Sequence, residues 1–183
     1  MDKAKQDSED AERKFSDFDL FMSHLFNGGT MAEWEGRSPK LVEVFHYAAV
    51  KLYNAGRYDE AHKVFHELVR LNHLNPEHMF GLAACLQKKK RYINAANVYL
   101  SSILLNPGVS NVESAFHIAE CLIIADKSLD QAEQYLKHVI KSCSGVDDLK
   151  DLKSVAEAKL DLLKRKRSSK EKSGRQKEKN KES

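Results

Sequence analysis

Proline and glycine are scarce in this sequence, which has 3 prolines and 8 glycines among its 183 residues. Val, Ile and Thr seldom alternate with polar residues, and this argues against a β-sheet. Ala, Leu, Lys, Glu and Gln are frequent, and these residue types favour helices. The composition therefore predicts an all-α chain of about one domain.

Long apolar runs are also lacking. The longest nearly uninterrupted run covers residues 79–86, whereas a membrane-spanning helix needs about 20 apolar residues. The first fifteen residues alternate in charge and contain no apolar segment of a secretory signal. We therefore expect a cytoplasmic protein without membrane insertion.

Cysteine is present at three positions, Cys85, Cys121 and Cys143, which form no Cys-x-x-Cys pair and lie among apolar residues. Such a pattern is typical of buried, reduced thiols in a cytosolic protein rather than of a disulfide or metal framework. We expect neither a metal site nor a cofactor.

Positive charge is concentrated at one end of the chain. Residues 164–183 hold ten Lys or Arg and three Glu, so the formal charge of +3 combines +7 on this tail with −4 on residues 1–163. A nucleic-acid-binding fold carries its basic patch on the fold itself, so we do not expect nucleic-acid binding by the compact part. The tail is predicted to be disordered and solubilising, with RNA, anionic lipid or an acidic partner as alternatives.

An internal repeat organises the middle of the sequence. A shift of 34 residues places Ala49 on Ala83 and Tyr58 on Tyr92, and a third copy follows at offsets of 36 and 37. Each copy has two apolar stripes of helical spacing, and small residues recur where two helices would approach closely. These alanines are Ala49, Ala83 and Ala119 in the first stripes, and Ala61, Ala95 and Ala132 in the second. A period of 34 residues is typical of the tetratricopeptide repeat (TPR).

The predicted architecture is three TPR helix pairs in a short superhelix, with an N-terminal amphipathic helix and a C-terminal capping helix. A solenoid needs such a terminal helix to cover its last apolar face. The expected segments are a flexible N-terminus (1–14), an N-terminal helical region (15–37), the repeats (38–145, as pairs at about 42–75, 76–109 and 112–145), the capping helix (146–163) and a disordered basic tail (164–183).

The N-terminal amphipathic helix carries Phe18, Phe21 and Leu25 on one side. We expect these residues either to form homodimer contacts or to fold back onto the repeats.

The sequence contains few features that would indicate catalysis. His62 and His66 are spaced to hold a divalent ion on one helix, but no third ligand accompanies them, so we interpret them as surface histidines. His117 has no paired nucleophile and is interpreted as a packed histidine that is hydrogen-bonded across helices. No phosphate-binding or nucleophile-elbow motif is present. We predict that the protein is not an enzyme.

The first helix of each pair should line the concave face of the superhelix. Beside the packed stripe, each of these helices has a second row at i, i+4 and i+7, and more than half of the row residues are Val, Ile or aromatic. We predict that the rows form a groove for an extended, mainly apolar peptide, although part of them, above all Val50 and Ala84, can instead belong to the core. The predicted groove residues are His46, Val50, Tyr53, Phe80, Ala84, Gln87, Phe116, Glu120 and Ile123.

Four stretches carry a resemblance to a known family. They are Phe26-Asn27-Gly28-Gly29-Thr30, Gly56-Arg57-Tyr58-Asp59-Glu60-Ala61, Gly81-Leu82-Ala83-Ala84-Cys85 and Phe116-His117-Ile118-Ala119-Glu120-Cys121. In order and spacing they resemble the TPR-type (class II) chaperones of bacterial type III secretion translocators. The sequence departs from that pattern at Lys90, where the second repeat would have a turn glycine, and in its longer basic tail.

The resemblance implies a non-enzymatic chaperone in the bacterial cytoplasm. It would bind one or two hydrophobic type III translocator proteins through the concave groove, and so prevent their aggregation and premature association before export. Two alternatives remain: a general TPR interaction adaptor, and a nucleic-acid-associated protein that acts through the basic tail.

Overall fold

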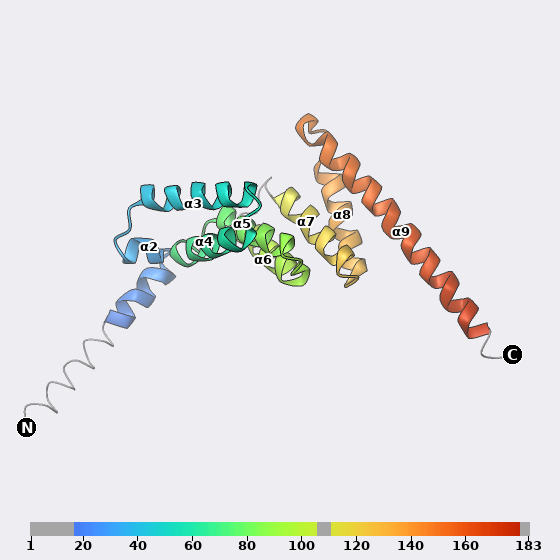
Figure 1. Cartoon of the computed structure of the whole chain (residues 1–183), viewed down its shortest axis with the longest axis horizontal. Coiled ribbons are helices and arrows are strands. Elements are labelled where there is room, and N and C mark those ends of the chain that lie inside the picture. Colours follow the sequence, from blue (N-terminus) through green and yellow to red (C-terminus); the bar gives the residue numbers. More distant parts are fainter. Residues whose placement is uncertain (1–16, 106–110, 180–183) are drawn as a thin grey trace, which may run out of the picture. The chain divides into compact units, whose positions relative to one another are not determined.

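The structure is a computed structural model that describes residues 17–105 and 111–179, with side chains as far as residue 168. The predicted flexible segment 1–14 lies outside these residues. The chain forms two compact units, Met1–Gly81 and Leu82–Ser183, and the division falls within α5 (Pro76–Lys88). Within the described ranges there are helices and no strands (Figure 1), which confirms the all-α prediction.

The first unit contains a helix at residues 17–26, α2 (Met31–Trp34), α3 (Pro39–Asn54), α4 (Tyr58–Leu71) and the start of α5. The α3 helix begins at Pro39, because the side chain of Ser38 accepts a hydrogen bond from the Leu41 backbone N–H and Pro39 occupies the first turn. α3 packs along α4 and forms the first helix pair.

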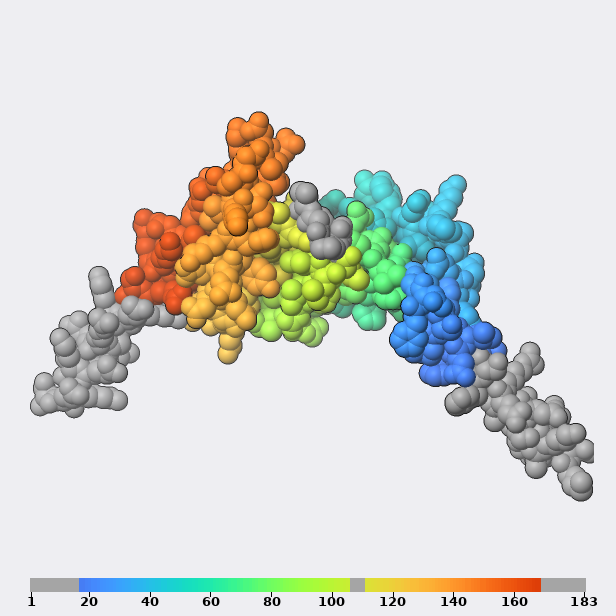
Figure 2. All heavy atoms as spheres, turned by 180° about the vertical axis from the view of Figure 1, so that it is seen from behind, coloured from blue at the N-terminus to red at the C-terminus, as the bar shows by residue number. Residues whose placement is uncertain are grey.

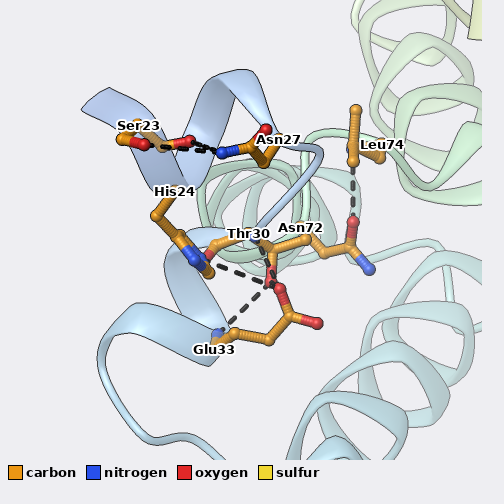
Figure 3. Close-up of polar contacts among 7 residues, drawn as sticks. All are labelled: Ser23, His24, Asn27, Thr30, Glu33, Asn72 and Leu74. Atoms are coloured by element: carbon orange, nitrogen blue, oxygen red, sulfur yellow. Dashed lines mark hydrogen bonds and ion pairs between the residues drawn. The ribbon is translucent and has the colours of Figure 1, made fainter. Parts of the chain in front are cut away.

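The N-terminal helix folds back against α2. Phe21 packs edge-on against Trp34 at a centroid distance of 5.2 Å, and Nε2 of His24 lies 2.9 Å from the Thr30 carbonyl oxygen. Thr30 and Glu33 form a reciprocal capping box, in which the Thr30 backbone N–H donates to the Glu33 carboxylate at 2.7 Å (Figure 3). The chain reversal between the helix at 17–26 and α2 is thereby held by local hydrogen bonds.

The second unit contains the rest of α5, α6 (Tyr92–Leu105), α7 (Asn111–Ile124), α8 (Leu129–Ser142), the 3₁₀ turn η1 (Asp147–Leu149) and α9 (Lys150–Lys179). Packing is sequential, because α7 contacts both α6 and α8, and α9 contacts α8. In Figure 2 the atoms of α8 and of the first part of α9, coloured orange to red, form one continuous surface.

Buried alanines mark the contacts of the paired helices. All six alanines that the repeat predicts at close approaches, Ala49, Ala61, Ala83, Ala95, Ala119 and Ala132, have 0% of their surface exposed. One aromatic of the same stripes differs: Phe45 is 37% exposed, although its spacing predicts a packed position. Phe45 belongs to the first helix of the first pair, so no preceding repeat covers it.

The turns inside the helix pairs need backbone in the left-handed region. Gly56 adopts φ +76° between α3 and α4, and Lys90 adopts φ +61° at the corresponding place between α5 and α6. Glycine takes this conformation without steric cost, whereas a side chain with a Cβ is strained there. The departure from the family pattern at Lys90 is therefore a site of backbone strain.

The C-terminal helix differs from its prediction. α9 continues to Lys179, although the sequence predicts disorder from residue 164. Lys166 Nζ lies 2.9 Å from the Asp126 carboxylate, and Arg167 contacts Asp130 at 2.7 Å and Glu133 at 2.9 Å. These ion pairs tie the start of the basic segment to α8 and the turn before it, which charge counting along the chain does not reveal.

Exchanging the turn residues at the two corresponding positions should shift stability in opposite directions. Lys90→Gly removes the strained φ and should stabilise the protein by about 1 kcal/mol, while Gly56→Ala introduces strain and should cost about 1 kcal/mol. Urea unfolding followed by circular dichroism measures both changes. Shifts of the same sign in the two variants would contradict the strain at Lys90.

Gly81 in α5 lies directly against the ring of Phe65, where a Cβ would overlap the ring. Alanine is the better helix former by about 1 kcal/mol, but we expect Gly81→Ala to destabilise the protein by roughly 1–3 kcal/mol through overpacking. The double variant Gly81→Ala with Phe65→Leu should recover part of this loss in the same unfolding measurement. An increase in stability of the single variant would refute the close approach.

Candidate peptide-binding rows

The first row, on α3, combines a packed histidine with a partly exposed apolar edge. The half-buried ring of His46 lies against Phe65 and His78, at centroid distances of 6.0 and 5.5 Å. Its Nε2 is 4.0 Å from the Glu77 carboxylate, and its buried Nδ1 has no hydrogen-bond partner among the described residues. The imidazole of His46 therefore belongs largely to the packing between α3 and α5.

Val50 and Tyr53 continue this row and are both partly exposed. The ring of Tyr53 packs edge-on against Tyr58 of α4 at 5.3 Å. This contact positions an aromatic side chain at the C-terminal end of α3 without burying it. Of the predicted residues in the first row, these two present apolar surface to solvent.

The second row, on α5, is half-buried throughout. Phe80 lies in the first unit, and Ala84 and Gln87 lie in the second, all at intermediate exposure. Gln87 is already used within the protein, since its Oε1 accepts a hydrogen bond from the Tyr99 hydroxyl at 2.9 Å. Its amide is thus positioned by α6, and its carbonyl oxygen is not a free acceptor for a peptide.

The third row, on α7, departs most from the sequence-based expectation. Phe116 is only 7% exposed, although it was predicted to face the groove. Lys159 of α9 lies over its ring at 5.7 Å from the centroid. Ile123 remains partly exposed. The prediction of Phe116 as a freely accessible groove residue therefore needs correction, because the C-terminal helix covers it.

Glu120 is the centre of a polar network in the second unit. Lys159 Nζ lies 2.9 Å from one carboxylate oxygen, and the other oxygen lies 3.0 Å from His117 Nδ1 and 3.4 Å from Gln87 Nε2. Burial alone would raise the pKa of Glu120, but the hydrogen bonds from His117 and Lys159 outweigh it and lower the pKa to about 2. The carboxylate is therefore ionised at neutral pH, and the network brings Gln87 and Glu120 together.

His117 is packed, as predicted. Its ring stacks on Tyr99 of α6 at a centroid distance of 5.2 Å, and its Nδ1 is hydrogen-bonded to Glu120 on its own helix. Sequence reasoning missed two members of this network. Tyr99 stands 34 residues after Phe65 in the repeat, but this spacing indicates no hydrogen bond to Gln87. Nothing in the sequence pattern pairs Lys159 with a residue 39 positions earlier.

The first unit also has a cavity of about 430 Å³ that the sequence did not predict. It lies beside α2, α3 and the start of α5, and its lining includes Thr30, Glu43, His46 and His78. Burial lowers the pKa of His78, so this histidine favours its neutral form. The mixed lining of the cavity contrasts with the mainly apolar exposed surface of Val50 and Tyr53.

The three cysteines are buried and free, in agreement with the sequence analysis. Burial raises the pKa of the Cys85 thiol to about 11 and, together with the nearby Glu120 carboxylate, that of Cys121 to about 12. These thiols are therefore protonated at neutral pH.

Metal-binding clusters and membrane-spanning helices are both absent from the part of the chain that the structure describes. Within residues 17–105 and 111–168, no group of three or more His, Cys, Asp or Glu side chains is arranged to hold a metal ion. None of the helices in the described ranges combines the length and the apolar character needed to cross a membrane.

The predicted dimer contacts have unequal environments. Phe18 is 56% exposed, whereas Phe21 and Leu25 are half-buried, with Phe21 packed against Trp34 of the same chain. The amphipathic helix thus uses part of its apolar side within its own chain. Other exposed apolar side chains on this helix are Leu20 and Phe26.

This chain is similar in sequence to a tetratricopeptide repeat family and to a Yersinia protein. The family model of the tetratricopeptide repeat matches residues 76–106, which comprise α5 and α6. Low calcium response locus protein H of Yersinia pestis is 30% identical over 145 residues, which are 79% of this chain and 84% of that protein.

Solved structures of type III secretion proteins are also similar to this chain. A chain in a T3SS complex from Aeromonas hydrophila has a TM-score of 0.76 and 28% identity, over 81% of this chain and 97% of that chain. The Yersinia enterocolitica type III secretion chaperone SycD, in complex with a peptide of the translocator YopD, has a TM-score of 0.66 and 28% identity, over 71% and 97% of the two chains. With its helix pairs, buried alanines and this similarity over most of its length, the chain belongs to the family of type III secretion translocator chaperones.

Proposed function

We propose that this protein is a cytoplasmic, non-enzymatic chaperone that holds an apolar, extended segment of a type III secretion translocator. The side chains that would contact the segment are the partly exposed apolar members of the three rows, Val50, Tyr53, Phe80 and Ile123. Ala84 would allow the bound chain to approach the α5 backbone. The observation that carries the proposal is this set of half-buried apolar side chains in a family whose member SycD has been solved with a translocator peptide.

The physical basis would be the burial of a few well-positioned side chains. Aromatic residues dominate the binding energy of most protein interfaces because they bury a large area at little cost in conformational entropy. Tyr53 is held by Tyr58, so little of its side-chain freedom remains to be lost on binding. A segment covered in this way would be prevented from aggregating or from inserting into a membrane before export.

The structure also refines the polar side of the proposal. His46, Gln87 and Glu120 are the polar members of the predicted groove, but each already contacts other groups of the protein. We therefore assign them to positioning the rows, while the apolar residues supply the contact area. This assignment favours recognition of apolar side chains over recognition of a peptide carboxylate.

The general adaptor remains the second candidate, because the TPR match alone carries no information about the bound partner. The two candidate functions differ in the partner that the protein would bind. A translocator chaperone should capture a membrane-active translocator of its own bacterium, whereas an adaptor would bind a partner without such apolar segments.

Tyr53→Ala should weaken capture of the translocator by about 30-fold, the loss of one interface hot spot of roughly 2 kcal/mol. Phe80→Glu should abolish it, because a charge would be desolvated against the bound apolar segment. Each translocator of the source bacterium is co-expressed with the chaperone, and the affinity of the captured one is measured by calorimetry.

Tyr47→Ala is the matched control, since Tyr47 is also on α3 but is 63% exposed and outside the rows. It should bind like the unmodified protein, and all variants should keep their helical circular dichroism. Unchanged binding by Tyr53→Ala and Phe80→Glu, or no capture of any translocator, would refute the proposal.

A homodimer would use the exposed apolar side of the N-terminal helix. Phe18→Glu should lower the mass in solution from dimer to monomer, because it places a charge in the contact and leaves the Phe21 packing intact. Light scattering coupled to gel filtration measures the mass. The control Asp19→Glu keeps the charge of its position and should not change the mass, and an unchanged mass of Phe18→Glu would exclude this dimer surface.

A further inference from the structure

The environment of Lys159 has the features of a binding site for a positive charge. Its ammonium group lies 2.9 Å from a carboxylate oxygen of Glu120 and 5.7 Å from the ring centroid of Phe116. A carboxylate and an aromatic face together attract a cation more strongly than either does alone. Both groups come from α7, one helical turn apart, so they stay together whether or not Lys159 is present.

The two groups that form the site are better buried than the lysine that fills it. The Glu120 side chain is 19% exposed and Phe116 is 7% exposed, while the Lys159 side chain is 34% exposed. The helix that carries Lys159 is held independently of it, because Ala156 and Leu163 of α9 are buried. Lys159 can therefore leave the site by rotating its flexible side chain while α9 stays in place.

The site adjoins a small, mainly apolar notch of about 150 Å³. Its lining consists of Glu120, Ile123, Ile124, Lys159, Leu162, Leu163 and Lys166. Ile124 and Leu162 are exposed at its rim, at 55% and 63%. An incoming chain with a cationic side chain next to an apolar one would find a fitting place for each.

When a partner covers the site, it matters whether the cation beside Glu120 is Lys159 or a side chain of the partner. An apolar segment laid over the Glu120–Lys159 pair would remove the pair from water, and this costs more than the pair regains unless its geometry is excellent. A segment that brings its own Lys or Arg exchanges one ion pair for another and releases Lys159 to solvent. Exchange keeps the Glu120 carboxylate neutralised at every stage.

We propose that Glu120 and Phe116 form a binding site for a Lys or Arg side chain of the bound segment, and that Lys159 occupies this site in the free protein. The inference deepens the proposed function and rests on it for the identity of the partner. The cation site itself is a property of this chain and can be tested without any partner.

Chemical rescue tests the site directly on the full chain. Lys159→Ala removes the ammonium group and most of its stem, and should lower the thermal unfolding temperature. The probe is n-propylammonium chloride, which matches the missing Cγ, Cδ, Cε and Nζ atoms. At 50 mM it should restore at least half of the loss relative to the same concentration of sodium chloride, since a ligand that binds only the native state stabilises it.

Two control variants separate site binding from a general salt effect. Lys137→Ala loses a comparable ion pair, to Glu133, that lies outside the notch and involves neither Glu120 nor Phe116, and it should show no rescue. Lys159→Ala with Glu120→Gln keeps the space but removes the carboxylate, and it should also show no rescue. Absence of rescue in Lys159→Ala, or equal rescue in the controls, would overturn the cation site.

The exchange is tested with the translocator that the unmodified protein captures. If Lys159 fills the site nine-tenths of the time, its removal should tighten binding about tenfold, and replacing the basic residue of the bound segment by Gln should abolish this gain. Equal affinities of Lys159→Ala and the unmodified protein would overturn the exchange. Rescue by n-propylammonium without capture of any translocator would refute the proposed function and leave the cation site intact.

Discussion

The close approach of paired helices at buried alanines is the constraint on which the rest of the molecule depends. The six repeat alanines have no exposed surface, and a larger side chain at any of them would separate the two helix backbones. This approach determines how each helix is rotated about its own axis. The rotation in turn decides that the neighbouring row, with Val50, Tyr53 and Phe80, is half-buried rather than fully exposed or fully packed.

Half-burial suits a chaperone for apolar segments. A fully exposed apolar row would promote aggregation of the chaperone itself, whereas a fully packed row would offer no contact area. Tyr53 shows the intermediate solution, since Tyr58 holds one edge of its ring and leaves the remainder accessible. The proposed binding surface would thus be a by-product of helix packing.

Charged side chains connect helices in both units. In the first unit, Arg70 of α4 lies 2.7 Å from the carboxylate of Glu35 at the end of α2, and the Thr30–Glu33 capping box closes a turn. In the second unit they connect helices, because Glu120 joins α7 to α5 and α9, and Arg167 joins α9 to α8. The ionised Glu120 carboxylate lies half-buried at the centre of these contacts, so any partner that covers it has to account for its charge.

The sequence by itself determined the helix pairs, the buried alanines and the turn at Lys90, because periodicity and backbone conformation are properties of short stretches of chain. Only the tertiary structure decided that Phe116 lies under Lys159, that Phe45 is exposed and that α9 continues past residue 163. Each of these depends on which side chain arrives from another helix, often more than thirty residues away. The spacing of residues along one helix carries no information about such a neighbour.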